Sequence, residues 1–337
     1  MGRSTLSITM PNYNHGRFLR DALMAVLDQS CAPEEIIVVD DCSTDNSVEI
    51  LDRMAMEHPL LRIIKNHENK GIVWNIHARL EACSTDYWFG TAADDLIYPG
   101  FIEQSMKLLT QHPEAGLSTT MTWAMNADGS NRNILPTPIV SMMPRFIPPE
   151  EVRNLLAKHG SWMCGNTCIY RRQPLLEAGG FDAALGPFCD GFIEMALALK
   201  YGACFIPAPL TCFRLTGTNY STTTYMQPEK AAMIHDRALH LMTHTYRDLF
   251  TPEIIRTWER SWTFKIRDFR ALAAIGERYR TTDLDAKKIP LAMRLAMAAH
   301  KFRRLYYAIS LGLVPAAVRR AWNRLKWRLF YRQPDGS

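Results

Sequence analysis

Two adjacent aspartates, Asp94 and Asp95, follow an aromatic, strand-like run in the stretch YWFGTAADDLIYP. Repulsion and desolvation make such a pair costly where a buried strand ends, so a compensating positive group is expected nearby. Their oxygens could hold a hard divalent cation, Mn²⁺ or Mg²⁺, which would clamp a diphosphate and stabilise it as a leaving group. The alternative is a pair of exposed aspartates in the turn before the YPG sequence.

A second carboxylate pair, Asp40 and Asp41, ends the β-branched run EEIIVVDD. A carboxylate at the end of a buried strand can accept a hydrogen bond from a base N–H or a ribose hydroxyl. In PNYNHGRFL, Tyr13 could stack on a base or pack as an ordinary loop tyrosine. No G-x-G-x-x-G follows the first strand and no G-x-x-x-x-G-K-[ST] occurs, which argues against dinucleotide-binding and P-loop sites.

The elements that must position these residues alternate along the first half of the chain. Apolar runs near LSITMP, EEIIVVDD, LLRIIKN and DYWFGTA predict strands, and the segments between them carry apolar residues at helical spacing. This order predicts an α/β fold with a mostly parallel, Rossmann-like sheet and right-handed crossovers. Ligands of such sheets bind beyond the carboxyl ends of the strands, so the two aspartate pairs could face one crevice.

The rest of the chain divides into a mixed segment and a helical one. Further strands and helices continue to about residue 227, and from residue 228 the sequence is almost entirely helical. We therefore expect a catalytic domain over 1–227 and a helical, basic C-terminal extension over 228–337.

The charge of the chain is concentrated in that extension. From Lys287 onward there are twelve Lys or Arg and one acid, Asp335, so the formal charge of this segment is about +11. The rest of the chain carries about −6, which gives the total of +5. Leu, Trp, Phe and Tyr alternate with the basic residues, as in helices that lie on an anionic membrane surface. The alternative is an extension packed on the catalytic domain with a solvated basic face. Nucleic acid is not expected as a partner, because the pattern differs from that of single-strand binders.

The sequence contains no signal peptide and no apolar run of 18 residues, so we expect a cytoplasmic protein, peripheral on the inner face of the cell membrane.

The motifs, taken together, resemble the family 2 inverting glycosyltransferases. The likeness runs in register over residues 5–110 through SITMPNYN, EEIIVVDDCSTDNS, NKGI and AADDLIYPGF. It continues more weakly to about residue 225 through GNTCIYRR, GGFD, CDGFIEMALALKYG and LTCFR. The resemblance implies a GT-A fold and transfer of a sugar from a nucleoside diphosphate to a hydroxyl acceptor.

The resemblance also implies roles for the nucleotide-binding residues. Pro11 and Tyr13 would line the base pocket, with Tyr13 against the ring. Asp41 would bond the base edge, and Asp40 would lie behind it. Asp94 would lie near the ribose or a metal-bound water.

The remaining roles concern the metal and the acceptor. Asp95 would be the principal metal ligand. Asp190, in FCDGF, matches the catalytic base; alternatively it is the N-cap of a helix over 191–201. Asn166, Arg171 and Arg214 are weaker candidates for the acceptor or diphosphate region.

Two departures from the family pattern refine the expectation. Thr216 stands where the family often has a metal-binding histidine, so that ligand is not assigned. No Q-x-x-R-W sequence follows Asp190 and no apolar spans flank the domain, which favours addition of a single sugar over processive synthesis.

The expected donor is a UDP-sugar, with GDP- or dTDP-sugars possible. The acceptor would be a glycan or lipid-linked hydroxyl in bacterial surface glycan or glycolipid synthesis. Two alternatives stay open: a nucleotidyltransferase on a related α/β sheet, and a non-catalytic, membrane-associated scaffold.

Overall fold

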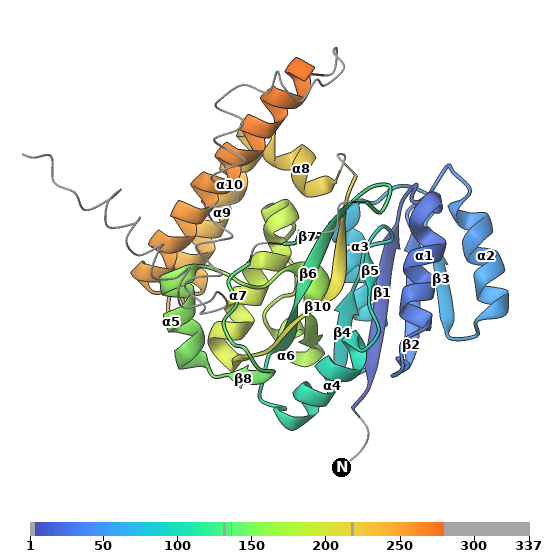
Figure 1. Cartoon of the computed structure of the whole chain (residues 1–337), viewed down its shortest axis with the longest axis horizontal. Coiled ribbons are helices and arrows are strands. Elements are labelled where there is room, and N and C mark those ends of the chain that lie inside the picture. Colours follow the sequence, from blue (N-terminus) through green and yellow to red (C-terminus); the bar gives the residue numbers. More distant parts are fainter. Residues whose placement is uncertain (1–3, 131–132, 136, 217–218, 280–337) are drawn as a thin grey trace, which may run out of the picture. The chain divides into compact units, whose positions relative to one another are not determined.

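The computed structural model describes residues 4–130, 133–135, 137–216 and 219–279 (Figure 1). The chain divides into two compact units, Met1–Ala273 and Ala274–Ser337. All the candidate site residues belong to the first unit, and the domain boundary expected at residue 227 falls inside it. The basic segment from Lys287 onward, on which the membrane prediction rests, lies outside the described residues.

The strands of the described residues join in one sheet of ten strands. They are β1 (Leu6–Asn12), β2 (Glu35–Asp40), β3 (Leu61–Lys65), β4 (Tyr87–Gly90), β5 (Leu96–Ile97), β6 (Leu117–Asn126), β7 (Asn133–Ile134), β8 (Arg145–Ile147), β9 (Ile169–Arg171) and β10 (Ala203–Leu215).

Helices connect these strands and follow them. They are α1 (Gly16–Leu27), α2 (Ser47–Glu57), α3 (Ile72–Ala82), α4 (Phe101–Gln111), α5 (Pro149–His159), α6 (Arg172–Glu177), α7 (Cys189–Tyr201), α8 (Tyr220–Tyr225), α9 (Pro228–His240) and α10 (Pro252–Tyr279). Shorter turns are the 3₁₀ segments η1 (Gly165–Thr167) and η2 (Ala183–Phe188) and the π-type segment η3 (Leu241–Thr245).

The sheet confirms the predicted alternation of parallel strands and helices in the first half. Its order is β3-β2-β1-β4-β9-β6-β10-β5, with β7 beside β6 and β8 beside β10. Strands β3, β2, β1 and β4 are parallel, as are β6 and β10. The short strand β9 enters antiparallel between β4 and β6. The first four parallel strands therefore release their connecting loops at one edge of the sheet.

Strand β2 is buried on both faces, as its unbroken apolar run predicted. Ile36 and Val38 pack into one apolar cluster, and Ile37 and Val39 into the other. Because successive side chains of a strand point to opposite faces, helices must cover both sides of this strand. Such a strand is a rigid support for the polar residues at its carboxyl end.

Helices α9 and α10 share the core of the sheet domain. Ile234 on α9 and Trp258 and Trp262 on α10 belong to the same apolar cluster as Leu185 and Phe192. The first part of the helical extension that we expected from residue 228 thus belongs, as far as Ala273, to the first compact unit. Among the described residues, no helix is both long and apolar enough to cross a membrane.

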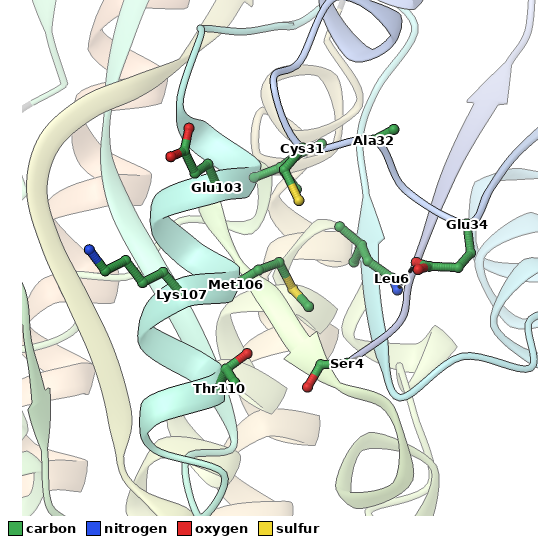
Figure 2. Close-up of a pocket in the computed structure, with 10 residues that line it drawn as sticks. Ser4, Leu6, Cys31, Ala32, Glu34, Glu103, Met106, Lys107 and Thr110 are labelled. Carbon is green, nitrogen blue, oxygen red and sulfur yellow. Dashed lines mark hydrogen bonds between the residues drawn. The ribbon is translucent and has the colours of Figure 1, made fainter. Parts of the chain in front are cut away.

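A pocket of about 270 Å³ lies at the amino ends of β1 and β2, beside α4 (Figure 2). Leu6, Cys31, Glu34, Met106 and Lys107 are among its lining residues. It contains none of the residues predicted to do chemistry, and the two aspartate pairs among these were expected at the opposite, carboxyl-end edge.

Candidate active site

Parallel strands β1, β2 and β4 bring the predicted nucleotide-binding residues to one edge of the sheet. Asn12, the last residue of β1, lies in register with Asp40, the last residue of β2. Pro11 is in β1, and Tyr13 follows it with 45% of its surface exposed. An exposed ring at the carboxyl end of a central strand is available to stack on a planar ligand.

Asp40 holds the loops together at this edge. Its Oδ1 accepts hydrogen bonds from Asn12 Nδ2 (2.7 Å) and Ser43 Oγ (2.6 Å), and its Oδ2 accepts from the Ser43 N–H (2.9 Å). Only 1% of Asp40 is exposed. These contacts leave Asp40 buried behind the loop surface.

Asp41 organises the loop that leads into α3. Asn66 Nδ2 and the Lys70 N–H both donate to its Oδ1, and the Gly71 N–H donates to its Oδ2, at 2.8–2.9 Å. Burial alone would raise the pKa of Asp41, but these bonds and one from Asn75 bring it below the ordinary value. Asp41 is therefore an ionised acceptor near neutral pH.

Asp94 and Asp95 lie between β4 and β5 and are buried, with 8% and 3% of their surfaces exposed. The alternative of an exposed turn pair is therefore wrong. Arg214 on β10 secures the turn: its N–H donates to Asp95 Oδ1 (2.9 Å), and its Nε donates to the Asp94 carbonyl (2.8 Å). This arginine is the principal positive group that the adjacent aspartates led us to expect.

Two further basic residues, from the start of α1, face the pair. His15 and Arg17 act electrostatically on Asp94 together with Arg214. The guanidinium groups of Arg17 and Arg214 each lie on the ring of Phe18, 4.1 and 4.4 Å from its centroid. The aromatic ring thus positions two cations beside a buried anion.

These cations do not fully compensate the two carboxyls. Burial raises the pKa of Asp94, against the effects of His15, Arg214 and Arg17. Burial and the charge of Asp94 raise the pKa of Asp95 well above its usual range, although the Arg214 N–H and the Asn166 side chain act in the opposite direction. A site in which two carboxyls resist full ionisation would bind an added cation favourably.

The donor set fits a hard cation only in part. Asp94 and Asp95 offer carboxylate oxygens, the ligands preferred by Mg²⁺ and similar ions. Within residues 4–130, 133–135, 137–216 and 219–279, no three His, Cys, Asp or Glu side chains are grouped to hold a metal ion. A cation at this pair would need to complete its shell with ligand oxygens and water.

The turn η1 links these aspartates to Asp190. The side chain of Asn166 lies close enough to Asp95 to lower its pKa, and its neighbour Gly165 packs directly against Asp190. A Cβ atom added at Gly165 would lie 2.1 Å from Asp190 Oδ2. Two adjacent residues therefore contact the two carboxylates that the sequence assigned to different roles.

Asp190 is the second residue of α7 and lies in its first turn. The N-cap is Phe188, so the alternative that Asp190 only caps this helix is wrong. Its Oδ1 accepts a hydrogen bond from the Gly191 N–H at 2.6 Å. Burial raises the pKa of Asp190, while this N–H and the charge of Lys265 lower it. A carboxylate with a raised pKa is a stronger base than an exposed aspartate.

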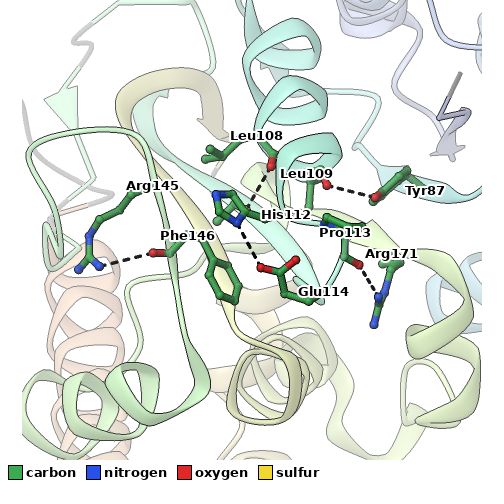
Figure 3. Close-up of polar contacts among 10 residues, drawn as sticks. Tyr87, Leu108, Leu109, His112, Pro113, Glu114, Arg145, Phe146 and Arg171 are labelled. Atoms are coloured by element: carbon green, nitrogen blue, oxygen red, sulfur yellow. Dashed lines mark hydrogen bonds and ion pairs between the residues drawn. The ribbon is translucent and has the colours of Figure 1, made fainter. Parts of the chain in front are cut away.

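Arg171 lies away from this group, which corrects its assignment to the acceptor or diphosphate region. It pairs with Tyr87, the first residue of β4, at the edge of the sheet opposite the aspartates. Its Nη1 donates to the carbonyl of Pro113 (Figure 3), and its guanidinium lies 5.0 Å from the ring centroid of Tyr201. Asn166 precedes β9 and Arg171 ends it, so the two lie at opposite ends of the strand, and the antiparallel direction of β9 puts the Asn166 end at the edge of the aspartates.

Two residues near Asp190 were missed by the sequence analysis. Glu194, one helical turn along α7, is fully buried, and burial together with the charge of Asp190 raises its pKa to about 8. Its Oε1 accepts from the hydroxyl of Tyr170 at 3.1 Å. Lys265, on α10, acts on both carboxyls. For Glu194 the available signal was a single charged residue within the apolar stretch FIEMALAL of α7, whereas Lys265 is an exposed residue of α10 and gave no such signal.

Comparison with a family model gives a match over residues 7–179 to the family described as Glycosyl transferase family 2. Relatives are distant. An uncharacterized protein of Mycobacterium tuberculosis is 25% identical over 288 residues, which are 82% of this chain and 87% of that protein. The uncharacterized glycosyltransferase YibD of Escherichia coli is 27% identical over 176 residues, 51% of this chain and half of YibD.

Two solved structures share the fold. TarS of S. aureus, in complex with UDP-GlcNAc, is 16% identical with a TM-score of 0.57, over 71% of this chain and 66% of that chain. The mannosyltransferase PcManGT of Pyrobaculum calidifontis, in complex with GDP-Man and Mn²⁺, is 20% identical with a TM-score of 0.57, over 96% and 88%. At these identities the likeness concerns the fold alone.

Proposed function

The chain belongs to glycosyl transferase family 2, and from that premise we propose that it is a metal-dependent, inverting enzyme that adds a single sugar. The GT-A fold and the general class, glycosyltransferase, are confirmed by the family match and the structural neighbours. The donor would be a nucleoside-diphosphate sugar, with a UDP-sugar favoured, and the acceptor a hydroxyl of a glycan or a lipid-linked glycan.

The observation that supports this proposal best is the contact of one turn with both carboxylate sites. Gly165 lies against Asp190 and the side chain of Asn166 lies near Asp95, so a candidate base and a candidate cation ligand flank the same two residues. An inverting transfer needs this pairing. One carboxylate takes the acceptor proton while the leaving diphosphate is neutralised on the other side of the anomeric carbon.

Each residue would contribute through its own contacts. Tyr13 would stack on the base and Pro11 would line the pocket. Asp41, already ionised, would accept a base N–H with the lone pair that its loop contacts leave available. Asp40 would keep the loop in place, and Asp190 would receive the proton of the acceptor hydroxyl at a carboxylate oxygen.

The metal proposal rests on Asp95, with Asp94 beside it. When bound, Mn²⁺ or Mg²⁺ would supply neutralisation of the diphosphate charge. Arg214 holds the turn that presents both carboxyls, so we assign it a positioning role near the diphosphate. The Mn²⁺ of the PcManGT complex supports the use of a cation on this fold.

Proteins of similar fold are described with two different donor nucleotides. TarS is described with UDP-GlcNAc and PcManGT with GDP-Man. We propose UDP on the sequence resemblance, and leave GDP and dTDP as outcomes of the test. The proposed setting, bacterial surface glycan or glycolipid assembly on the inner face of the membrane, depends on the basic segment after Lys287.

Calorimetric titration of UDP, GDP and dTDP into the full chain, with and without Mn²⁺, tests the proposal. We expect one nucleotide to bind in a Mn²⁺-dependent manner, and Asp95→Ala to weaken that binding roughly tenfold or more, since a metal ligand is lost. Asp21→Ala, which removes an exposed carboxylate from α1, is the matched control and should bind as the wild type does.

Asp190→Asn separates an enzyme from a scaffold. It should bind the same nucleotide with unchanged affinity, and sugar transfer should fall roughly 10²–10⁴-fold because the base is lost. NMR of the product would show the inverted anomeric configuration. Failure of a well-folded wild type to bind any nucleotide would instead favour the scaffold, and pyrophosphate release from a nucleoside triphosphate would favour a nucleotidyltransferase.

A further inference from the structure

The short segment η2 leads directly into the helix that carries Asp190. Its last residue is Phe188, and the next residue, Cys189, is both the C-cap of η2 and the first residue of α7. Asp190 is the second residue of that helix. Since no linker separates the two elements, a shift of η2 also shifts the first turn of α7. The position of the candidate base therefore depends on what holds η2.

Two glycines allow this segment more than one backbone path. Gly180 precedes it with a φ of +69°, and Gly186 interrupts the turns of η2 with a φ of +50° and a ψ of −129°. Glycine adopts such angles without steric cost, and it also adopts many others. Contacts from outside the segment are therefore needed to fix one conformation of η2.

Apolar side chains anchor the two ends of the segment. Phe181 is buried, and its ring centroid lies 5.5 Å from that of Trp88. At the other end, the Phe188 ring lies 5.7 Å from that of Trp258 and 5.6 Å from that of Trp262. Apolar burial is not directional, so these contacts hold the ends without fixing the orientation of the turn between them.

Asp182, the N-cap of η2, makes the directional contacts. Its Oδ1 accepts a hydrogen bond from the Ala184 N–H at 2.8 Å, which caps the turn. Its Oδ2 accepts two hydrogen bonds from Arg237 on α9, from Nε at 2.9 Å and from Nη2 at 2.7 Å. One carboxylate thus ties the first turn of η2 to a helix that lies 55 residues further along the chain.

Helix α9 is a firm support for this tether. Ala231, Ile234 and Ala238 of α9 are buried in the apolar core of the sheet domain. Ile234 also lies beside the kink of η2, because a Cβ added at Gly186 would be 3.2 Å from Ile234 Cδ1. Arg237 follows three residues later and is thus on the same side of the helix. Helix α9 therefore contacts η2 at its kink and at its start.

The pair of Asp182 and Arg237 lies partly in solvent. The two side chains are 26% and 41% exposed, and ion pairs of that kind contribute little to the free energy of unfolding. The placement of a catalytic group is more sensitive, because a displacement of about 1 Å can lower a rate roughly 10²-fold. The pair should therefore affect the position of Asp190 more than the folding of the domain.

We propose that Arg237 is a positioning residue for the transfer reaction. Through Asp182 it holds η2, and with it the start of α7, in the place where Asp190 can take the proton of the acceptor hydroxyl. This inference rests on the proposed function, in which Asp190 is the base. It gives α9, which lies beyond the domain boundary expected at residue 227, a part in the chemistry in addition to its packing.

The first test uses the full chain without substrate. Hydrogen exchange, read by mass spectrometry on peptides that cover residues 181–190, follows the protection of η2. In Arg237→Met, which removes the charge, these amides should exchange roughly fivefold faster than in the wild type, because the tether is lost. Arg237→Lys should restore part of the protection. Lys230→Met, which removes an exposed cation from the same helix, should exchange as the wild type does.

The second test measures release of nucleoside diphosphate from UDP-GlcNAc or GDP-mannose in the presence of Mn²⁺. In Arg237→Met, kcat should fall roughly tenfold because Asp190 is displaced, while the KM of the donor should change less than about twofold. The melting temperature should fall by less than about 4 °C. Arg237→Lys should recover most of kcat, since a lysine can also donate to Asp182. Equal losses in kcat and donor affinity, with a large fall in melting temperature, would show a structural role only.

A double-mutant cycle tests the route through Asp182. Asp182→Ser keeps a side chain that can cap η2 but is too short to reach Arg237. If Arg237 acts through Asp182, adding Arg237→Met to Asp182→Ser should cause no further loss of kcat. A further loss as large as that in the wild-type background would contradict this route.

Three outcomes would count against the inference in different ways. Unchanged exchange of η2 in Arg237→Met would overturn the tether, whatever the protein catalyses. Faster exchange with unchanged kcat would overturn the part in the reaction. A wild type that binds no nucleotide would contradict the proposed function, and with it this role in the reaction, while the exchange measurement would still decide the tether.

Discussion

Asp94 and Asp95 show how a chain accommodates two buried like charges. Arg214 bonds the backbone of one and the side chain of the other, so the turn is fixed even while the pKa of Asp95 stays raised. A bound divalent cation could supply the positive charge that the two carboxyls still lack, and could bind a diphosphate at the same time. In a purely structural ion-pair network, nearby positive groups would balance the negative charge of the two aspartates, whereas a binding site leaves part of that charge for its ligand.

Glu194 is the residue whose protonation should affect stability most clearly. Its folded pKa of about 8 exceeds the ordinary value of 4.5, so its neutral form stabilises the fold at low pH, and this stabilisation is lost as pH rises through about 8. Glu194→Gln keeps a neutral side chain at all pH values. We expect the variant to lose less stability than the wild type between pH 5 and pH 8.5, by roughly 1–3 kcal/mol.

Urea unfolding at the two pH values measures this difference. Glu151, which pairs with Arg145 and has a lowered pKa, offers the control Glu151→Gln, for which no such relative gain is expected. Equal pH dependence of the wild type and Glu194→Gln would show that Glu194 is ionised in the folded protein at pH 7.

At the scale of elements, the turn η1 depends on a residue without a side chain. An alanine at position 165 would bring its Cβ to 2.1 Å from Asp190 Oδ2, so either the turn or the base must move. Misplacement of a catalytic group by about 1 Å can lower a rate roughly 10²-fold. We therefore expect Gly165→Ala to reduce transfer about 10²-fold while nucleotide affinity changes little, as separate titrations and rate measurements would show.

Gly129→Ala is the comparison for that experiment. Gly129 lies in the turn between β6 and β7 with no atom within 4 Å of an added Cβ, although its φ of +82° makes a side chain unfavourable. It should lose about 1 kcal/mol of stability and retain activity. Full transfer by a folded Gly165→Ala protein would remove the contact between η1 and Asp190 from the proposed mechanism.

At the scale of the whole molecule, the first compact unit extends beyond the domain boundary that we expected at residue 227. Residues 228–273 belong to the first compact unit, and Trp258 and Trp262 are buried in its core. A chain ending at residue 227 would expose Phe188 and Tyr225 to water. We expect it to aggregate or to unfold at far lower urea, whereas a chain ending at residue 279 should unfold cooperatively and bind nucleotide.

The same shorter chain tests the proposed membrane contact. Each Lys or Arg near an anionic surface contributes about 1 kcal/mol, and the segment from Lys287 onward holds twelve. The full chain should sediment with vesicles that contain phosphatidylglycerol but not with neutral ones, and the chain ending at residue 279 should sediment with neither. Equal sedimentation of both chains with the anionic vesicles would locate the contact elsewhere.

The sequence by itself determined the parallel half of the sheet and the edge at which its carboxylates lie. Both follow from local patterns: the apolar run of β2, the helical spacing of α1, and aspartates at strand ends. Asp40 and Asp41 are where that reasoning put them, and the general class of enzyme followed from the motifs in order. Their individual roles in binding and catalysis stay predictions.

Only the tertiary structure decided which distant segments meet at the site. The antiparallel entry of β9 between β4 and β6 brings Asn166 to Asp95 and sends Arg171 away, although both residues belong to one motif. Packing of α10 brings Trp258 and Trp262 against Phe188, two residues before Asp190, across sequence separations of 70 and 74 residues. The direction of a strand and the docking of a helix depend on apolar surface that is buried between segments far apart in the sequence. A short stretch of sequence does not contain that information.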